Sequence, residues 1–203
     1  VDFKIALDIA ANSFYNVDTK LYFISPDKQF TAPQMSKYVI DFADHFRNKY
    51  HPDIFTSFED PLAENEWDET AILTKELKDR GILLLGDDLY VTQIRRVSIG
   101  VEKGAGTAIL IKPNQNGTII GTIDTAEYGL NNGMEEVASH RSGETRDKAL
   151  ADLATGFRMF AIKTGAPQPE SEYPNPEEWE RRNKYLRKIE IQEKAMPSVG
   201  PNE

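Results

Sequence analysis

Cysteine is absent from the 203 residues of this sequence. That absence excludes a disulfide scaffold, a thiolate zinc site and a cysteine nucleophile, and it fits a reducing compartment, so we expect a cytoplasmic protein. No apolar run approaches the roughly 18 residues that a membrane helix needs, so we expect no membrane partner. Positive charge is also scarce, with 24 Lys and Arg against 33 Asp and Glu and a net charge of −9. This balance argues against nucleic-acid binding, although local positive charge is still able to hold a phosphate-bearing substrate.

Hydrophobic residues make up 39% of the sequence and charged residues 28%, which is enough for a packed core. Short apolar runs alternate with segments of helical periodicity, and the connections between them are short. The expected strands are residues 3–7, 54–58, 82–85, 107–111, 135–138 and 159–162, with an edge hairpin around 21–24. The expected helices are residues 31–50, 69–80, 92–103, 119–131, 146–156 and 177–194.

The alternation of strands and helices predicts an α/β protein with a parallel sheet and helices outside it. The nearly continuous apolar character of the strands is typical of strands buried on both faces. Thr31 and Gln34 have the spacing of a capping box at a helix start, and Gly81 and Gly104 stand where helices should end. We expect one domain over residues 1–195 and a flexible tail over 196–203.

An ionisable residue follows each of the six expected parallel strands. These residues are Asp8, Glu59, Asp87, Lys112, His140 and Lys163. In a parallel αβ barrel the carboxyl ends of the strands converge on one face, where such folds hold their active sites. A single acid after a strand is more often a helix cap or a solvated turn. Six in succession favour a functional site.

Three of these residues are carboxylates, Asp8, Glu59 and Asp87. Carboxylate oxygens are ligands that Mg²⁺ prefers, and Mg²⁺ often shares its site with an anionic substrate. The alternative is that the doublets at residues 59–60 and 87–88 cap the helices that follow, and we expect this for one member of each doublet.

Lys112 and Lys163 each end an otherwise apolar strand. Two cations close to each other and to a metal would lower the pKa of at least one of them, which would provide a general base. The alternative is a pair of structural salt bridges with Asp or Glu.

Residues 139–145 combine serines, an arginine and the start of a helix. Arg141 offers a planar fork for a phosphate, Ser142 offers a hydroxyl, and the helix start adds backbone N–H donors. The alternative is a turn that Thr145 caps.

Six segments in order along the chain resemble the C-terminal barrel of enolase, phosphopyruvate hydratase. They are residues 6–10, 58–64, 86–89, 110–118, 139–145 and 162–167. The resemblance implies a TIM-type (β/α) barrel in which this chain supplies strands 3 to 8. It also implies a lyase of glycolysis and gluconeogenesis that reversibly dehydrates 2-phosphoglycerate to phosphoenolpyruvate with Mg²⁺.

The resemblance also implies a role for each site residue. Asp8, Glu59 and Asp87 match the metal ligands, and Glu59 and Asp87 also border the substrate. Lys112 matches the base that removes the α-proton, and Lys163 matches the lysine that helps to hold the substrate carboxylate. The substrate-binding loop matches Ser139, His140, Arg141 and Ser142, with Arg141 and Ser142 at the phosphate. A Lys base with Mg²⁺ stabilising an ene-diolate is a known pattern of this superfamily.

Family members carry an N-terminal capping domain and the first barrel strands before the segment that matches residues 6–10. The glutamate that protonates the leaving hydroxyl belongs to that part. We therefore expect a fragment, a chain whose sheet edges are completed from elsewhere, or a shortened relative, and we expect a homo-oligomer, dimeric or higher. The alternative function is a catalytically silent enolase-like domain that binds a ligand or partner without turnover.

Overall fold

The computed structural model describes residues 3–141, 144–166 and 176–195. The chain forms two compact units, Val1–Glu136 and Val137–Glu203, and each is described by itself. The expected tail at residues 196–203 lies outside the described residues, and the single-domain organisation stays a prediction. In the described ranges no helix combines the length and apolar character needed to cross a bilayer.

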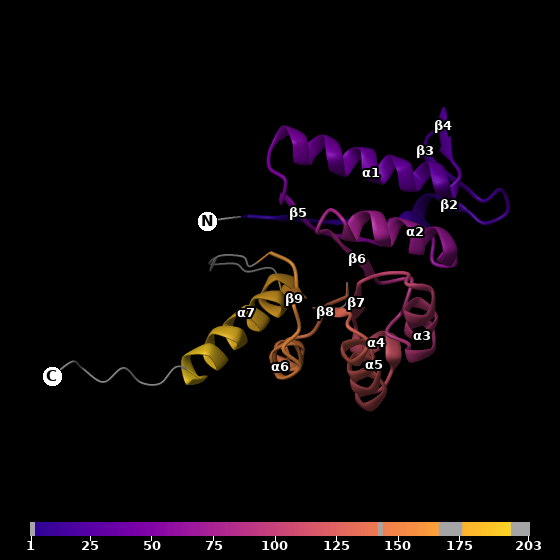
Figure 1. Cartoon of the computed structure of the whole chain (residues 1–203). Coiled ribbons are helices and arrows are strands. Elements are labelled where there is room, and N and C mark those ends of the chain that lie inside the picture. Colours follow the sequence, from indigo (N-terminus) through magenta and orange to yellow (C-terminus); the bar gives the residue numbers. More distant parts are fainter. Residues whose placement is uncertain (1–2, 142–143, 167–175, 196–203) are drawn as a thin grey trace. The chain divides into compact units, whose positions relative to one another are not determined.

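The first unit is built on four parallel strands. They lie side by side in the order β1 (Ile5–Asp8), β5 (Phe55–Glu59), β6 (Leu83–Gly86) and β7 (Ala108–Ile111) (Figure 1). All four residues of β7 are buried, as expected for a strand covered on both faces. The predicted parallel α/β arrangement is confirmed for this unit.

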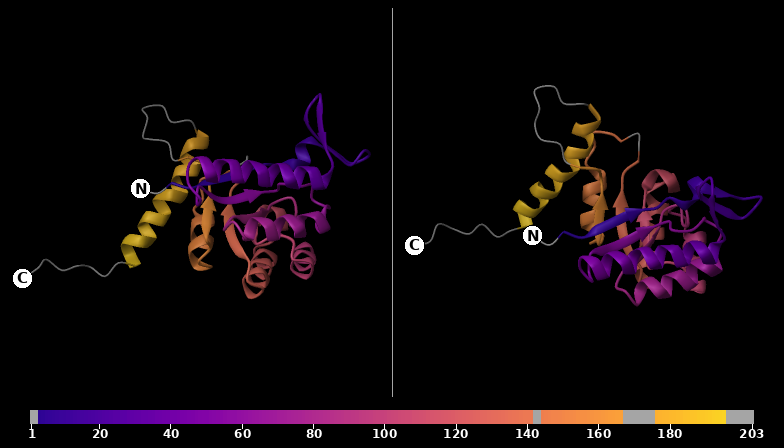
Figure 2. Two further views of the ribbon diagram at one scale, coloured as in Figure 1. Left: turned by 45° about the horizontal axis from the view of Figure 1, so that its top comes forward. Right: turned by 90° about the horizontal axis from the view of Figure 1, so that it is seen from above.

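Helices connect these strands and lie next to one another outside the sheet (Figure 2). They are α1 (Ala32–Lys49), α2 (Trp67–Lys78), α3 (Ile94–Lys103), α4 (Pro113–Asn116) and α5 (Ile119–Asn131). The predicted capping interaction is present, because the backbone N–H of Thr31 donates to Gln34 Oε1 at 2.9 Å. Gly104 ends α3 with a φ of 69°, a left-handed conformation that suits glycine. The short helix α4 was not predicted.

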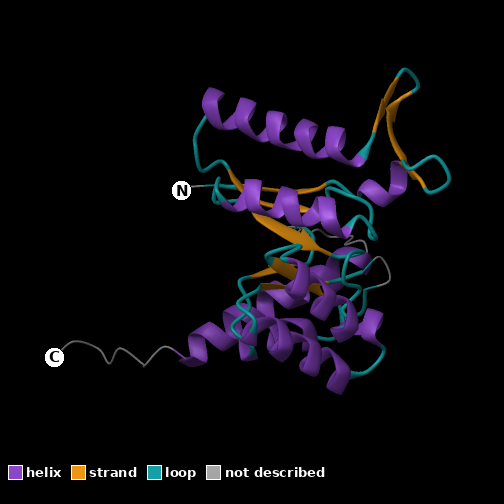
Figure 3. Cartoon of the chain, turned by 45° about the vertical axis from the view of Figure 1, so that its right-hand side comes forward, coloured by secondary structure: helices purple, strands orange, loops and turns teal. Residues whose placement is uncertain are grey.

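A separate small sheet accounts for the predicted hairpin. After the short 3₁₀ helix η1 (Ala11–Phe14), strands β2 (Tyr15–Asn16), β3 (Leu21–Ser25) and β4 (Lys28–Phe30) pair antiparallel (Figure 3). The prediction of an edge hairpin is therefore wrong in placement, because these strands do not extend the parallel sheet. Tyr22 is fully buried, and its hydroxyl accepts the N–H of Ala63 at 2.8 Å, which fastens the small sheet to the loop after β5.

The second unit contains β8 (Glu135–Ser139), which starts at the end of the first unit, and β9 (Ala161–Lys163), which pairs with β8 in parallel. Helices α6 (Ala149–Gly156) and α7 (Pro176–Ala195) pack against each other. The strand predicted at 159–162 begins about two residues too early. The helix predicted from residue 146 begins only at Ala149, whereas its predicted end at Gly156 is confirmed. Lys184 of α7 is fully buried and pairs with Glu144 Oε1 at 3.0 Å, which ties α7 to the loop before α6.

The outer edge of β1 is partly exposed, and we expect it to promote self-association of the chain. Ile5 is 40% exposed, although β1 is an apolar strand at the end of the described sheet. An exposed apolar edge favours pairing with another chain, and a lysine on such an edge opposes it. We expect the chain to self-associate with rising concentration in sedimentation experiments, and Ile5→Lys to reduce this. Ile72→Lys on α2, where the isoleucine is 59% exposed, is the matched control. A wild-type chain that stays monomeric would contradict the prediction.

A buried acid lies at the start of β8. Glu136 is fully buried, and neither carboxylate oxygen has a hydrogen-bond partner among the described residues. A Cβ added to Gly129 of α5 would lie 3.6 Å from Glu136 Oε1, so the carboxyl faces this helix. Burial, and to a lesser extent the charge of Glu135, raises the pKa of Glu136 from 4.5 to about 8.

This raised pKa sets the direction of a pH effect on stability. Between pH 4.5 and about 8 the folded chain keeps a proton on Glu136 that the unfolded chain releases, so stability falls as pH rises. The scale is roughly 1.4 kcal/mol for each unit of pKa difference. We expect Glu136→Gln to lose less stability than the original chain across this window in urea unfolding. Glu135→Gln, at the exposed neighbour whose charge is the smaller cause of the raised pKa, should keep most of the original pH dependence. Equal slopes for all three chains would refute the prediction.

Candidate active site

The carboxyl ends of three adjacent strands bring the predicted carboxylates to one edge of the sheet. Asp8 and Glu59 are the last residues of β1 and β5 and are register partners. Glu59 also pairs with Leu85 of β6, and Asp87 follows two residues beyond Leu85. Glu59 is 4% exposed, whereas Asp8 is exposed. Carboxylate oxygens suit a hard cation such as Mg²⁺. Among the described residues, however, the acidic trio whose oxygens lie within 4.8 Å of one another is Asp60, Asp87 and Asp88, so a site formed by Asp8, Glu59 and Asp87 stays a prediction that rests on strand register.

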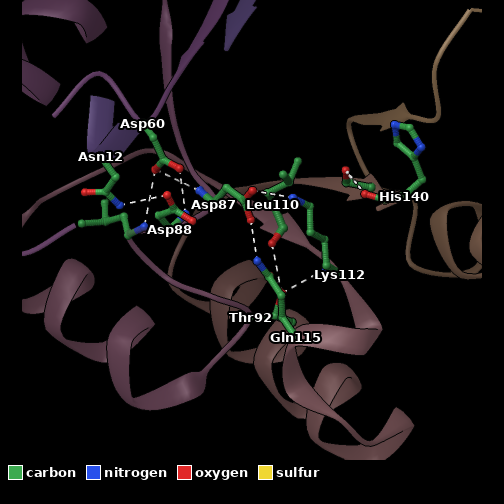
Figure 4. A network of polar contacts seen from close by, with 11 residues as sticks. Asn12, Asp60, Asp87, Asp88, Thr92, Leu110, Lys112, Gln115 and His140 are labelled. Carbon is green, nitrogen blue, oxygen red and sulfur yellow. Dashed lines mark hydrogen bonds and ion pairs between the residues drawn. The ribbon is translucent and has the colours of Figure 1, made fainter. Parts of the chain in front are cut away.

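The lysine after β7 reaches this group. Lys112 directly follows β7 and precedes α4, and its Nζ forms an ion pair with Asp87 Oδ2. The two side chains are 11% and 15% exposed. The sequence left two possibilities for Lys112, a general base or a structural salt bridge, and a salt bridge is present. Its partner, however, is one of the predicted metal ligands, so the ion pair lies inside the candidate site (Figure 4).

Asp60 holds the loop that carries Asp87. Its carboxylate accepts the backbone N–H of Asp87 at 3.1 Å and of Asp88 at 2.7 Å. Burial raises the pKa of Asp60 to about 7, against the effect of the N–H donors that favour its charged form. The alternative that the two acidic doublets cap the following helices is wrong, because Glu66 precedes α2 and Gln93 precedes α3.

A second acidic group overlaps the predicted one. Carboxylate oxygens of Asp60, Asp87 and Asp88 lie within 4.8 Å of one another, an arrangement able to hold a metal ion. The oxygens of Asp60 already accept backbone N–H groups, and Asp88 Oδ2 accepts Asn12 Nδ2 at 2.9 Å. These bonds explain the closeness of the three carboxylates without a metal. We therefore interpret Asp60 and Asp88 as residues that stabilise the loop after β6. Asp87 remains a candidate metal ligand.

Thr92 and Gln115 are two further members of the site that were not predicted from the sequence. Gln115 Nε2 donates to Asp87 Oδ1 at 2.7 Å, and Thr92 Oγ1 donates to Gln115 Oε1 at 2.8 Å. The backbone N–H of Lys112 donates to Thr92 Oγ1 at 3.0 Å (Figure 4). Gln115 lies inside a segment that resembles enolase, which was the available signal.

Backbone strain accompanies this network. Val91 and Thr92 have φ values of 42° and 50°, which β-branched residues rarely adopt. Each such residue costs on the order of 1–3 kcal/mol and persists only where its surroundings fix it. The helix predicted from about residue 92 therefore begins only at Ile94. Asn116 Nδ2, which donates to the carbonyl of Thr92 at 3.0 Å, is one of the groups that hold the strained turn.

The second unit brings together part of the predicted substrate loop. Ser139, the last residue of β8, is buried and is the register partner of Lys163. The N–H of His140 donates to the carbonyl of Lys163 at 3.0 Å. Arg141 is exposed, and Ser142 lies outside the described residues.

The alternative of a turn capped by Thr145 is not supported. Lys148 is the residue that precedes α6, and Asp147 Oδ1, rather than a threonine oxygen, accepts the N–H of Ala149 at 3.0 Å. Thr145 contributes its carbonyl to the buried Lys184 instead.

Carboxylates and a lysine at the carboxyl ends of adjacent parallel strands define an α/β protein with a strand-end site, the arrangement of TIM-barrel enzymes. Residues 1–193 match the family described as "Enolase, C-terminal TIM barrel domain", and the chain belongs to this family. The fold class and the family resemblance predicted from the sequence are thereby confirmed.

Curated relatives are similar to almost the whole chain. The enolase of Bifidobacterium animalis subsp. lactis is 40% identical over 190 residues, which cover 93% of this chain and 40% of the relative. The enolase of Methanococcus aeolicus is 41% identical over 192 residues, which cover 95% of this chain and 41% of the relative. The chain thus spans about two fifths of the length of these relatives.

Proposed function

We propose that this chain is the catalytic barrel portion of an enolase, which removes water from 2-phosphoglycerate to give phosphoenolpyruvate in glycolysis and gluconeogenesis. The observation that carries the proposal is the contact between Lys112 and Asp87 at neighbouring strand ends. It places a candidate base beside a candidate metal ligand in a mostly buried site, where electrostatic effects are strong. Membership of the enolase family gives the reaction class.

Asp8, Glu59 and Asp87 are the residues that we assign to Mg²⁺. A divalent cation at this position would supply positive charge beside the substrate carboxylate, where negative charge develops as the α-proton leaves. Lys112 accepts that proton on Nζ in its neutral form, and the electron pair of the C–H bond moves toward the carboxylate. The leaving hydroxyl then departs as water after it receives a proton, a role that we assign to the part of the enolase outside these 203 residues.

The second unit supplies the groups that we assign to substrate binding. We assign Lys163 to the substrate carboxylate and Arg141 and Ser142 to its phosphate, because guanidinium and hydroxyl groups match phosphate oxygens. Ser139 and His140 border the same loop. We further propose that the protein is a homo-oligomer and that it acts in the cytoplasm.

Turnover by the longest gene product that contains this chain tests the proposal. With Mg²⁺ and 2-phosphoglycerate, we expect ultraviolet absorbance to report the formation of phosphoenolpyruvate, and a chelator to stop it. Calorimetry should show that 2-phosphoglycerate binds only when Mg²⁺ is present. Binding without turnover would instead identify a catalytically silent enolase-like domain, and neither binding nor turnover would refute both functions.

A further inference from the structure

A closed ring of hydrogen bonds joins the loop after β6 to the loop after β7. Its four members are Asp87, Lys112, Thr92 and Gln115. Lys112 Nζ contacts Asp87 Oδ2, and Gln115 Nε2 donates to Asp87 Oδ1 at 2.7 Å, so each carboxylate oxygen has its own donor. Thr92 closes the ring through its hydroxyl, which donates to Gln115 Oε1 and accepts the backbone N–H of Lys112.

The ring fixes both the rotation of the Asp87 carboxylate and the position of the Lys112 backbone. A carboxylate held by one donor is free to swing about its last bond, whereas one donor on each oxygen leaves a single orientation. The oxygens keep further lone pairs, because a carboxylate offers about four acceptor positions. Gln115 is neutral, so it orients Asp87 without cancelling the negative charge that would attract a cation.

Thr92 occupies the most constrained position of the ring. It is fully buried and has a left-handed backbone, although it is β-branched. Strain of this kind persists where neighbouring groups over-determine it and is concentrated at functional sites. Here three of the fixing groups, Lys112, Gln115 and Asn116, come from the segment that follows β7. The strained turn therefore fixes the position of the loop after β6 relative to the loop after β7.

We propose that Gln115 and Thr92 are positioning residues that pre-orient Asp87 and Lys112 for metal binding and proton transfer. This inference rests on the proposed function for the roles of Asp87 and Lys112. The partners of metal ligands commonly contribute 10–100-fold to metal affinity, because they hold the ligand in its binding orientation. Loss of the Gln115 donor should therefore weaken metal binding without unfolding the chain.

Binding of Mn²⁺ alone to the 203-residue chain, followed by electron paramagnetic resonance, tests the role of Gln115. Gln115→Met keeps the length of the side chain and removes both hydrogen bonds, and we expect it to weaken Mn²⁺ binding about 10–100-fold. The metal-free melting temperature should stay close to that of Gln29→Met, a control at an exposed strand residue. Unchanged Mn²⁺ affinity in Gln115→Met would overturn the inference, as would a loss explained by unfolding.

The role of the Thr92 hydroxyl is tested by variants that remove or restore it. Hydrogen exchange at the Lys112 amide measures the effect without a metal. Thr92→Val keeps the shape and removes the acceptor of the Lys112 N–H, so hydrogen exchange at that amide should accelerate about tenfold. Thr92→Ser, which restores the hydroxyl, should recover both slow exchange and Mn²⁺ affinity. Equal exchange in the valine and serine variants would overturn the role of Thr92.

Different outcomes would refute the positioning role of Gln115 and Thr92 and the proposed enolase reaction. If the original chain binds Mn²⁺ and the variants behave as expected, but no phosphoenolpyruvate forms, the proposed function falls and the positioning role stands. If turnover occurs and Gln115→Met binds Mn²⁺ normally, the positioning role falls and the proposed function stands. If the original chain does not bind Mn²⁺, the metal assignment on which both depend is refuted.

Discussion

Replacing Lys112 with alanine in the longest gene product should lower the rate of phosphoenolpyruvate formation by roughly 10²–10⁴-fold, the usual scale for one positioned base. The reason is that Lys112 is the group that we assign to take the α-proton, and its Nζ already contacts Asp87 beside the proposed metal position. Steady-state kinetics with saturating Mg²⁺ measures the loss, which should fall mainly on kcat because binding groups are retained.

Lys112→Arg separates the charge of this residue from its basicity. Arginine keeps the positive charge that pairs with Asp87, but it does not lose its proton in proteins. We therefore expect this variant to be as inactive as Lys112→Ala while it still binds the substrate. Lys103→Ala, at a partly exposed lysine that pairs with Asp68 on the surface, is the control and should be fully active. Substantial activity of Lys112→Arg would contradict the assignment of the base, and Lys163 would become the candidate.

Asp87→Ala should abolish the binding of Mg²⁺ measured by calorimetry. The variant removes one of three proposed ligands and also leaves the partly buried Lys112 without its carboxylate partner. An uncompensated positive charge at the site opposes a cation, so both effects act in the same direction.

Two further variants distinguish the two overlapping acidic groups. If Asp8, Glu59 and Asp87 bind the metal, Asp8→Asn should weaken Mg²⁺ binding strongly, whereas Asp88→Asn should change it little. The opposite result would place the metal among Asp60, Asp87 and Asp88, whose carboxylate oxygens lie within 4.8 Å of one another. Unchanged binding in Asp87→Ala would exclude both groups, because Asp87 belongs to each.

The strands and their ends were predictable because burial on both faces leaves a strong pattern in the sequence. Residues 108–111 form an uninterrupted apolar run, so the polar residue after it, Lys112, could be recognised as a strand-end residue. The same reasoning found Glu59 and Asp87. Asp8 was found from the short run at residues 3–7, although β1 is mostly exposed in the structure. The helix end at Gly104 was also predictable, because this glycine has the left-handed conformation that often ends a helix. Gly81 is left-handed too, but α2 ends earlier, at Lys78.

The polar ring was not predictable from pattern alone. Left-handed turns are normally recognised by glycine or asparagine, and Val91 and Thr92 give no such signal, so the helical pattern was extended over them. Gln115 lies on α4, a helix of four residues that is too short to show periodicity. One member of the doublet at residues 59–60 was expected to cap a helix, whereas Asp60 accepts backbone N–H groups of the loop after β6.

Proton NMR of 2-phosphoglycerate in deuterated buffer tests the central claim most directly, because it follows proton removal without requiring loss of water. With Mg²⁺ and the 203-residue chain, we expect the α-proton signal to decay through exchange with solvent deuterium. The same experiment with Lys112→Arg should show no decay above the protein-free background. A stable α-proton signal with the original chain, under conditions where calorimetry shows that Mg²⁺ and substrate are bound, would contradict the account.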